Sequence, residues 1–312
     1  MRTPRSTPGP ILIAGPTASG KSGLALALAE RLGGTVINAD SMQVYRELAI
    51  LTARPSPEDE ARAPHALYGC VSGAEAYSAG RYAADATRAI AEARAQGRVP
   101  IVVGGTGLYF KALLEGLSPV PDADPEVRAY WRAEAARRPA VELHALLGAR
   151  DPEMAGRLMP TDRQRIVRAL EVLESTGRSL ADWQREPGTP VLAEARTTRL
   201  LVLPERQAQA AAIEARFDAM LAEGALEEVQ GLLACAFSTE LPIMRALGVA
   251  PLAAHLGGAL ALDEAARIAK ADTRKYAKRQ LTWLRRNIIS WKIIDTQYME
   301  SISRGNLSFI DS

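Results

Sequence analysis

The sequence predicts an α/β fold in which helices flank a parallel sheet and a helical domain is inserted into it. Two observations predict this fold. Short apolar runs alternate with helical segments in the first third of the chain, and continuous helical sequence replaces them near residue 121 until a β-like run returns at 198–204. Such alternation favours parallel strands, because crossover helices cover the faces of the sheet. We expect a core of residues 1–120 and 190–312, and an insertion domain of residues 121–189.

The expected strands are short apolar runs that stop at glycine or aspartate. They are residues 10–15 (PILIAG), 35–39 (TVINA) and 99–105 (VPIVVGG). Between them, residues 22–34 and 79–97 have helical composition, and Gly33 and Gly34 would end the first helix. Ligands of open parallel sheets bind at the carboxyl ends of the strands. The loops at 15–22, 40–43 and 104–107 are therefore expected at one edge.

The insertion is predicted from a break at residues 118–127, SPVPDADPEV, which contains three prolines and three acidic residues. Helical sequence follows at 126–138, 140–149 and 161–177. In the last segment, Thr161 and Gln164 have the spacing of a capping box. Residues 198–204 are expected to return to the sheet, and the chain from about Glu205 to be helical.

The composition is that of a globular protein, with 47% apolar and 24% charged residues. No apolar run is long enough to cross a membrane, and the N-terminus lacks the apolar stretch of a secretory signal. Cys70 and Cys235 stand alone, so we expect buried apolar side chains rather than a disulfide or a metal site. These features favour the cytoplasm, and no surplus apolar stripe indicates an oligomer, so we expect a monomer.

A glycine-rich loop follows the first expected strand and precedes the first expected helix. It satisfies the pattern GxxxxGK[ST], the signature of a P-loop. Loop amides and the helix N-terminus would hold two adjacent phosphates, Lys21 would add a charge, and the Ser22 hydroxyl would bind Mg²⁺. The pattern predicts a P-loop NTPase-like sheet with a diphosphate or triphosphate site, formed by Gly15, Pro16, Thr17, Ala18, Ser19, Gly20, Lys21 and Ser22.

Two further polar residues are expected at the same edge. Asp40 ends the second strand, and its spacing fits a metal helper and a general base equally well, with a helix cap as a weaker third reading. Thr106 lies in the glycine-rich run 104–107, where its hydroxyl could bind a phosphate or a reacting group. A tight turn would explain these glycines as well as close backbone approach does.

Basic residues gather in two helical segments although the net charge is only +2. Residues 270–286 contain seven basic residues and one acidic residue, Asp272. Helical spacing places five basic side chains on one side of the last long helix: Arg267, Lys270, Arg274, Lys278 and Arg285. With Tyr276 and Trp283 nearby they are compatible with RNA contacts, although basic helices often have no partner. In the insertion, a solvated face is the simplest interpretation of Arg163, Arg165 and Arg168.

Five segments taken together resemble the tRNA dimethylallyltransferase family (tRNA isopentenyltransferases). The resemblance covers most of the chain, because the segments occur in the family's order: GPTASGKS at 15–22, INADSMQVYR at 37–46, VGGTGLYFKALLEGLS at 103–118, TDRQRIVRALEVLESTGRSLADW at 161–183 and TRKYAKRQLTWLR at 273–285. It implies transfer of a dimethylallyl group from dimethylallyl diphosphate to N6 of the adenosine 3′-adjacent to the tRNA anticodon (position 37), with release of diphosphate.

The same resemblance implies roles for individual residues. The P-loop would hold the donor's diphosphate with Mg²⁺, Asp40 would be the general base, and Thr106 would lie near donor and target base. We also expect Arg245 near the donor phosphates. The expected partners are the donor and the tRNA anticodon stem-loop, without an obligate protein partner. The implied tRNA contacts are Asp40, Ser41, Met42, Gln43, Thr106, Arg128, Gln164, Arg165, Ile166, Val167, Arg168, Lys278 and Arg279.

Some positions depart from the family pattern, and three other functions compete. Met42 stands where many members have Arg, and Leu51 where many have Gly. One alternative is a P-loop small-molecule kinase with ATP in the loop, and another is an isopentenyltransferase that acts on free AMP or ADP. The large insertion argues against both. A non-catalytic, nucleotide-gated RNA-binding switch is the third, and it would need no carboxylate at Asp40.

Overall fold

The structure is a computed structural model that describes residues 9–192, 197–288 and 290–295. It divides the chain into two compact units, one of residues 1–113 and 192–312 and the other of residues Leu114–Val191. The whole range predicted for the insertion lies inside the second unit. Each unit is described separately below.

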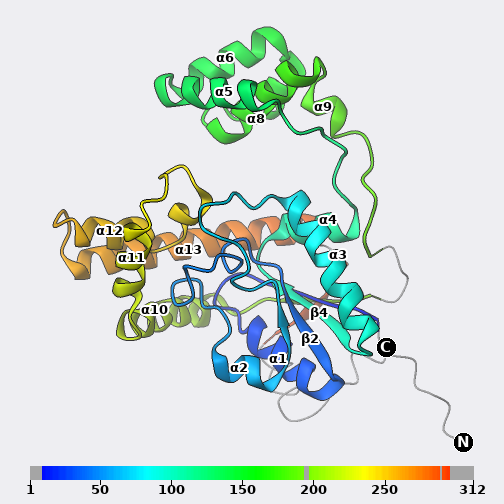
Figure 1. The fold of residues 1–312 in the computed structure, drawn as a ribbon, viewed down its shortest axis with the longest axis vertical. Helices are drawn as coiled ribbons and strands as arrows, with labels where there is room; N and C mark the ends of the chain where they lie inside the picture. The colour runs from blue at the N-terminus through cyan, green and yellow to red at the C-terminus, as the bar shows by residue number, and fades with distance from the viewer. Residues whose placement is uncertain (1–8, 193–196, 289, 296–312) are drawn as a thin grey trace, which may run out of the picture. The chain divides into compact units, whose positions relative to one another are not determined.

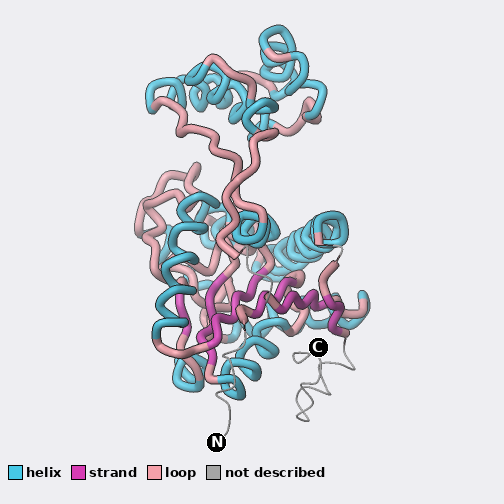
Figure 2. Tube along the Cα trace, turned by 90° about the vertical axis from the view of Figure 1, so that its right-hand side faces the viewer, coloured by secondary structure: helices cyan, strands magenta, loops and turns pink. Residues whose placement is uncertain are grey.

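Among the described residues, the first unit is built on a six-stranded sheet in the order β3-β2-β4-β1-β5-β6, in which every pairing is parallel. The strands are magenta in Figure 2. This confirms the predicted α/β class. The strands are β1 (Ile11–Ala14), β2 (Gly34–Asn38), β3 (His65–Ala66), β4 (Val99–Gly104), β5 (Thr198–Val202) and β6 (Lys292–Ile294). The expectation of helix alone after Glu205 was wrong at β6, because a three-residue strand carries no readable period of its own.

Helices cover the sheet and continue beyond it (Figure 1). Both α1 and α3 pack against β2 and β4, and the C-terminal helices pack on one another as the pairs α10–α13, α11–α12 and α12–α13. In the described residues of this unit the helices are α1 (Lys21–Leu32), α2 (Pro57–Arg62), α3 (Ala79–Ala95), α4 (Gly107–Leu114), α10 (Arg206–Ala222), α11 (Ala225–Ala234), the 3₁₀ turn η1 (Pro242–Arg245), α12 (Val249–Leu256) and α13 (Leu262–Asn287).

One core cluster of this unit lies between the sheet and α1. Side chains of β1, β2, β4 and β5 pack in one buried cluster with Leu24 and Leu28 of α1. Strands covered on both faces are apolar along their whole length, which is why the runs were legible in the sequence. Gly33 closes α1 with a left-handed φ of 63°, as its position in the sequence predicted.

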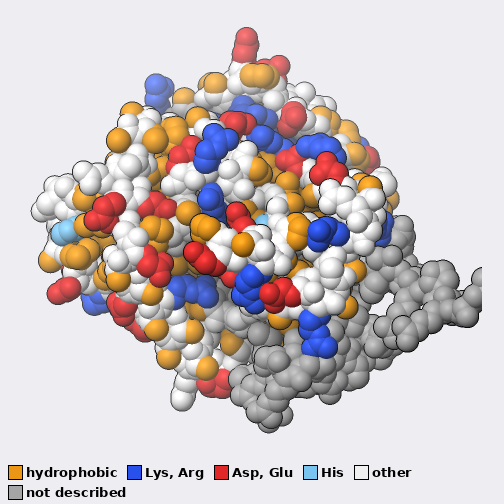
Figure 3. Space-filling model, turned by 60° about the horizontal axis from the view of Figure 1, so that its bottom comes forward, with side chains coloured by type: hydrophobic (Ala, Val, Ile, Leu, Met, Phe, Trp, Pro, Cys, Tyr) orange, Lys and Arg blue, Asp and Glu red, His pale blue; other side chains and the backbone are white. Residues whose placement is uncertain are grey.

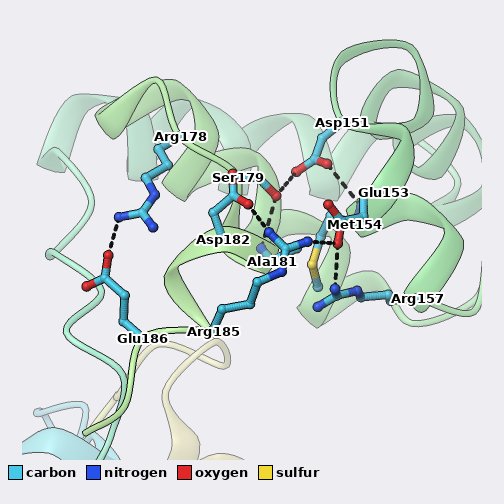
Figure 4. Close-up of polar contacts among 10 residues, drawn as sticks. All are labelled: Asp151, Glu153, Met154, Arg157, Arg178, Ser179, Ala181, Asp182, Arg185 and Glu186. Carbon is cyan, nitrogen blue, oxygen red and sulfur yellow. Dashed lines mark hydrogen bonds and ion pairs between the residues drawn. The ribbon is translucent and has the colours of Figure 1, made fainter.

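The second unit is helical and has a core of its own. Its helices are α5 (Pro125–Arg137), α6 (Ala140–Arg150), α7 (Pro152–Arg157), α8 (Arg163–Thr176) and α9 (Leu180–Trp183). Trp131, Leu143 and Leu170 are among the buried residues that join α5, α6 and α8. Charged and polar side chains link α7 to the α9 region (Figure 4): Arg185 contacts both Glu153 and Asp182, and the Ser179 hydroxyl donates to the buried Asp151 carboxylate over 2.7 Å.

The capping box predicted at Thr161 and Gln164 is wrong. Helix α8 begins at Arg163, so the capping residue is Asp162, whose carboxylate accepts a 3.3 Å hydrogen bond from the Arg165 amide. An aspartate is as good an N-cap as a threonine, and here it stands one position closer to the helix. The spacing alone could not distinguish the two registers.

The expectation that both cysteines are buried is also wrong. Cys70 and Cys235 are exposed, because one lies just beyond the short β3 and the other caps the end of α11. In the described ranges, no cluster of three or more His, Cys, Asp or Glu side chains could hold a metal ion, and no helix is long and apolar enough to cross a membrane. On the face drawn in Figure 3, basic and acidic side chains are interspersed.

Candidate active site

The loop between β1 and α1 has the backbone of an anion site. Gly20 and Ala18 both have positive φ angles, 83° and 58°, so the chain turns sharply there. Gly15 passes so close to β5 that an added Cβ would lie 2.9 Å from the Val202 carbonyl oxygen. The buried Ser19 hydroxyl has no hydrogen-bond partner among the described residues. Together with the uncapped amides at the start of α1, it leaves donors available to a phosphate.

Lys21 and Arg216 bring positive charge to this loop from two different elements. The Lys21 ammonium donates to the Pro16 carbonyl over 3.2 Å. Burial lowers the pKa of Lys21 to about 8, while the Asp40 carboxylate raises it and the Arg216 guanidinium lowers it further. Arg216 lies on α10 and lines a cavity with Thr17 and Ala18. No local pattern pointed to the position of Arg216 beside this loop, because Arg216 stands in ordinary helical sequence far along the chain.

Asp40 is held rigidly at the end of β2. The fully buried Asn38 accepts a hydrogen bond from the Asp40 amide over 2.8 Å and donates to the Asp40 carbonyl over 2.9 Å. The Met42 amide donates to Asp40 Oδ1 over 2.9 Å. Within the described part of the chain Oδ2 has no such partner, so one carboxylate oxygen is fixed and the other is available for proton transfer.

The glycine-rich run after β4 brings Thr106 against the Asp40 loop. The Thr106 amide donates to the Ala39 carbonyl over 3.2 Å, and Thr106 Oγ1 accepts from the Ser41 amide over 3.0 Å. A Cβ on Gly104 would lie 2.0 Å from the Ala39 oxygen. Neither this glycine nor its neighbours Gly105 and Gly107 has a positive φ. Close approach, rather than a left-handed turn, therefore explains the glycines.

Three tyrosines lie within electrostatic reach of the Asp40 carboxylate. Burial raises the pKa values of Tyr68, Tyr109 and Tyr276, and in each case the charge of Asp40 raises the pKa further. These phenols stay neutral at physiological pH and add aromatic surface near Asp40. Tyr276 was expected from the sequence as a possible RNA contact, whereas no pattern pointed to a role for Tyr68 or Tyr109.

Two cavities flank the phosphate loop. One of about 230 Å³ is lined by Ser22, Gln43 and Tyr68, among others. The other, of about 50 Å³, is lined by Thr17 and Arg216 together with apolar side chains that include Leu51. A ligand whose phosphates lie in the loop therefore has space beside it on either side.

Two family models match the sequence. One described as IPP transferase matches residues 43–287, and one described as isopentenyl transferase matches residues 9–68. The chain belongs to the IPP transferase family. It is 52% identical to a tRNA dimethylallyltransferase of Parvibaculum lavamentivorans over 301 residues, which cover 96% of this chain and 95% of the relative. A tRNA dimethylallyltransferase of Nitrobacter hamburgensis is 56% identical over 278 residues, 89% of this chain and 88% of the relative.

Solved structures of IPP transferase relatives have the same fold. The tRNA isopentenylpyrophosphate transferase of Bacillus halodurans superposes with a TM-score of 0.67 at 31% identity, and covers 97% of this chain and 98% of its own. A eukaryotic dimethylallyltransferase acting on tRNA gives a TM-score of 0.79 at 27% identity, over 97% of this chain and 77% of its own. The family resemblance seen in the five sequence segments is therefore confirmed.

In this IPP transferase the basic side of α13 is divided in two. Arg267 pairs with Glu264 of its own helix, while Lys270 and Arg274 pair with Glu214 of α10. Further along, Lys278 and Arg279 are exposed, and among the described residues neither has an ion-pair partner. Only the C-terminal half of the predicted stripe offers uncompensated charge to a polyanion.

In the second unit of this IPP transferase, the structure sorts the expected tRNA contacts by exposure. Arg165 is 74% exposed and lies 3.5 Å from Asp162, Gln164 is also exposed, and Arg128 lies 3.7 Å from Asp122. Arg168 lies 3.6 Å from Glu171. The tRNA contacts expected of Ile166 and Val167 need correction, because both side chains are buried in the core of the unit.

The expectation that Arg245 lies near the donor phosphates stays a prediction. Arg245 ends η1 and its exposed guanidinium lies 3.1 Å from the Glu240 carboxylate, and among the contacts described for it none reaches the phosphate loop. Arg216 is the arginine that faces Lys21. The reason is topological, because α10 passes beside the loop and brings Arg216 there, whereas the sequence offers no local pattern for this contact.

Proposed function

We propose that this protein transfers a dimethylallyl group from dimethylallyl diphosphate to N6 of the adenosine at position 37 of tRNA, releasing diphosphate. One observation carries the proposal: Asp40, with a free carboxylate oxygen, lies in a loop bonded to Thr106 at the sheet edge where the phosphate loop opens. Relatives more than half identical over most of the chain bear the name tRNA dimethylallyltransferase.

The donor's diphosphate would occupy the loop of residues 15–22. The unpartnered Ser19 hydroxyl and the positive charges of Lys21 and Arg216 suit a group with several anionic oxygens. The exposed Ser22 hydroxyl would hold Mg²⁺, since this ion needs few protein ligands when phosphates and water complete its shell. Mg²⁺ bound there would help to neutralise the charge of the departing diphosphate.

Asp40 would act on the acceptor. As the N6 lone pair bonds to C1 of the dimethylallyl group, the C1–O bond breaks and its electrons leave with the diphosphate. The proton that N6 loses passes to Asp40 Oδ2, while the Met42 amide holds Oδ1 in place. Thr106 Oγ1 accepts a hydrogen bond from the Ser41 amide, so its own O–H remains available to the dimethylallyl donor or to the target adenine. The three neutral tyrosines would exclude water around the reacting atoms.

The RNA would be held by basic and polar side chains of both units. Lys278 and Arg279 of α13 suit phosphates of the anticodon stem-loop, and Arg128, Gln164, Arg165 and Arg168 would contact it from the insertion. The target adenine must leave its stack so that its N6 amine can reach the donor at the sheet edge. The monomeric state and the cytoplasmic location stay predictions.

The test mixes the protein with Mg²⁺, tRNA from cells that lack the modification and radiolabelled dimethylallyl diphosphate. Label on adenosine 37 would support the proposal. Label on AMP or ADP but not on tRNA would favour the adenylate isopentenyltransferase. ATP consumed with a small alcohol, without label in either acceptor, would favour the kinase. The names of the relatives favour neither alternative.

A further inference from the structure

Gln280 is a buried residue of α13 that bonds two loops of the site with one side-chain amide. Its Oε1 accepts a hydrogen bond from the Thr17 amide over 2.9 Å, and its Nε2 donates to the Gly105 carbonyl over 3.0 Å. The side chain is 7% exposed. Both ends of the amide are therefore engaged, one by the phosphate loop and the other by the loop that carries Thr106.

The Thr106 loop is shaped to receive this contact. An added Cβ on Gly105 would lie 2.2 Å from Gln280 Nε2, so only glycine leaves room for the amide. One turn further along α13, the Trp283 ring approaches Gly107 so closely that an added Cβ on this glycine would lie 2.0 Å from a ring carbon. The helix thus packs on the loop through two side chains at i and i+3.

Gln209 provides an internal comparison. It lies on α10, is 9% exposed, and donates from Nε2 to the Thr17 carbonyl over 2.9 Å. Both backbone groups of Thr17 are therefore held by glutamines from the C-terminal helices. Among the described residues, the Gln209 side chain hydrogen-bonds only to the phosphate loop, whereas that of Gln280 joins this loop to the Thr106 loop.

We propose that Gln280 is a positioning residue, which sets the phosphate loop in register with the Thr106 and Asp40 loops. This inference rests on the proposed function. The leaving diphosphate would lie in the first loop, and the acceptor amine beside the other two. A misplacement of about 1 Å between reacting groups can cost about 10² in rate. Loss of the bridge should therefore slow the chemical step, and not only weaken donor binding.

The test compares Gln280→Met with Gln209→Met, which remove one glutamine amide each and keep similar volume. Single-turnover transfer is measured at saturating donor and tRNA, with KM for both and a thermal melt. Gln280→Met is expected to slow the single-turnover step by about tenfold or more with little change in KM for tRNA. Gln209→Met is expected mainly to raise the donor KM and to slow the step far less.

Gly105→Ala offers a second route to the same loss, because its methyl group displaces the flexible Gln280 amide. Combined with Gln280→Met it should cost little more than the worse single variant, since both remove one interaction. A wild-type single-turnover rate in Gln280→Met, or an equal loss in Gln209→Met, would overturn the inference. If Gln280→Met does not fold, the rate of Gly105→Ala decides in the same way. A wild-type protein that transfers no label would overturn the proposed function instead.

Discussion

The Ser41 backbone amide donates a 3.0 Å hydrogen bond to the Thr106 hydroxyl oxygen, and so joins the loop after β2 to the loop after β4. Asp40 precedes Ser41, and Gly105 precedes Thr106 and is bonded to Gln280. The site is therefore a set of three loops held in register by a small number of hydrogen bonds.

Asp40→Asn should abolish proton acceptance while keeping the shape of the side chain and the Met42 bond. We expect transfer to fall by about 10²–10⁴ while tRNA binding is retained. Single-turnover transfer and tRNA binding measured side by side would check this, with Asp272→Asn on the exposed face of α13 as the control. Transfer within threefold of the wild type would remove Asp40 from the role of base and favour the RNA-binding switch.

Thr106→Val should remove the acceptor of the Ser41 amide, while Thr106→Ser should keep it. An amide left without a partner costs about 1–3 kcal/mol. We therefore expect Thr106→Val to lower both kcat and the melting temperature, and Thr106→Ser to lose little of either. Equal kcat values for the two variants would contradict a role in catalysis for the hydrogen bond between Ser41 and Thr106.

Donor binding should weaken in alkaline solution because burial lowers the pKa of Lys21 to about 8. The ammonium form attracts the diphosphate, so affinity should be level below that pH. Above it, the free protein loses the proton, and affinity should fall by about tenfold per pH unit. Binding of dimethylallyl diphosphate in the absence of tRNA would measure this, and Lys21→Arg should move the break to higher pH. A level profile up to pH 10 would contradict the prediction.

Arg216→Gln should weaken donor binding, since it removes a cation from the phosphate loop. It should also raise the pKa of Lys21, because the guanidinium of Arg216 lowers that pKa in the wild type. The alkaline break in donor affinity should then shift upward. Arg245→Gln is the matched control, since its charge is paired with Glu240 at the surface. A larger loss of donor affinity in Arg245→Gln than in Arg216→Gln would favour Arg245 as the arginine near the donor phosphates.

Lys278→Gln should weaken tRNA binding and reduce its salt dependence. A cation that contacts a phosphate contributes about one unit to the slope of log K against log salt. Arg274→Gln on the same helix should change the slope less, because Arg274 already pairs with Glu214. Equal slopes for the two variants would show that the intramolecular pairs open when RNA binds.

Local patterns were sufficient for much of the fold. The P-loop residues 15–22, the glycine that ends α1 and the apolar runs of β1, β2 and β4 depend on neighbours only a few residues apart. Asp40 could be placed at the sheet edge for the same reason, because parallel strands end on one side. The first residue of α8 could not be predicted from the sequence, since Thr161 and Asp162 are both good N-caps.

The sequence by itself determined the phosphate loop, the parallel sheet, the helical insertion and the membership of the family. Only the tertiary structure decided that Arg216 faces Lys21, that Ile166 and Val167 are buried, and that Gln280 bridges Thr17 and Gly105. The physical reason is the separation along the chain. A motif is encoded by adjacent residues, whereas these contacts arise when α10 and α13, formed near the end of the chain, pack against loops formed near its beginning.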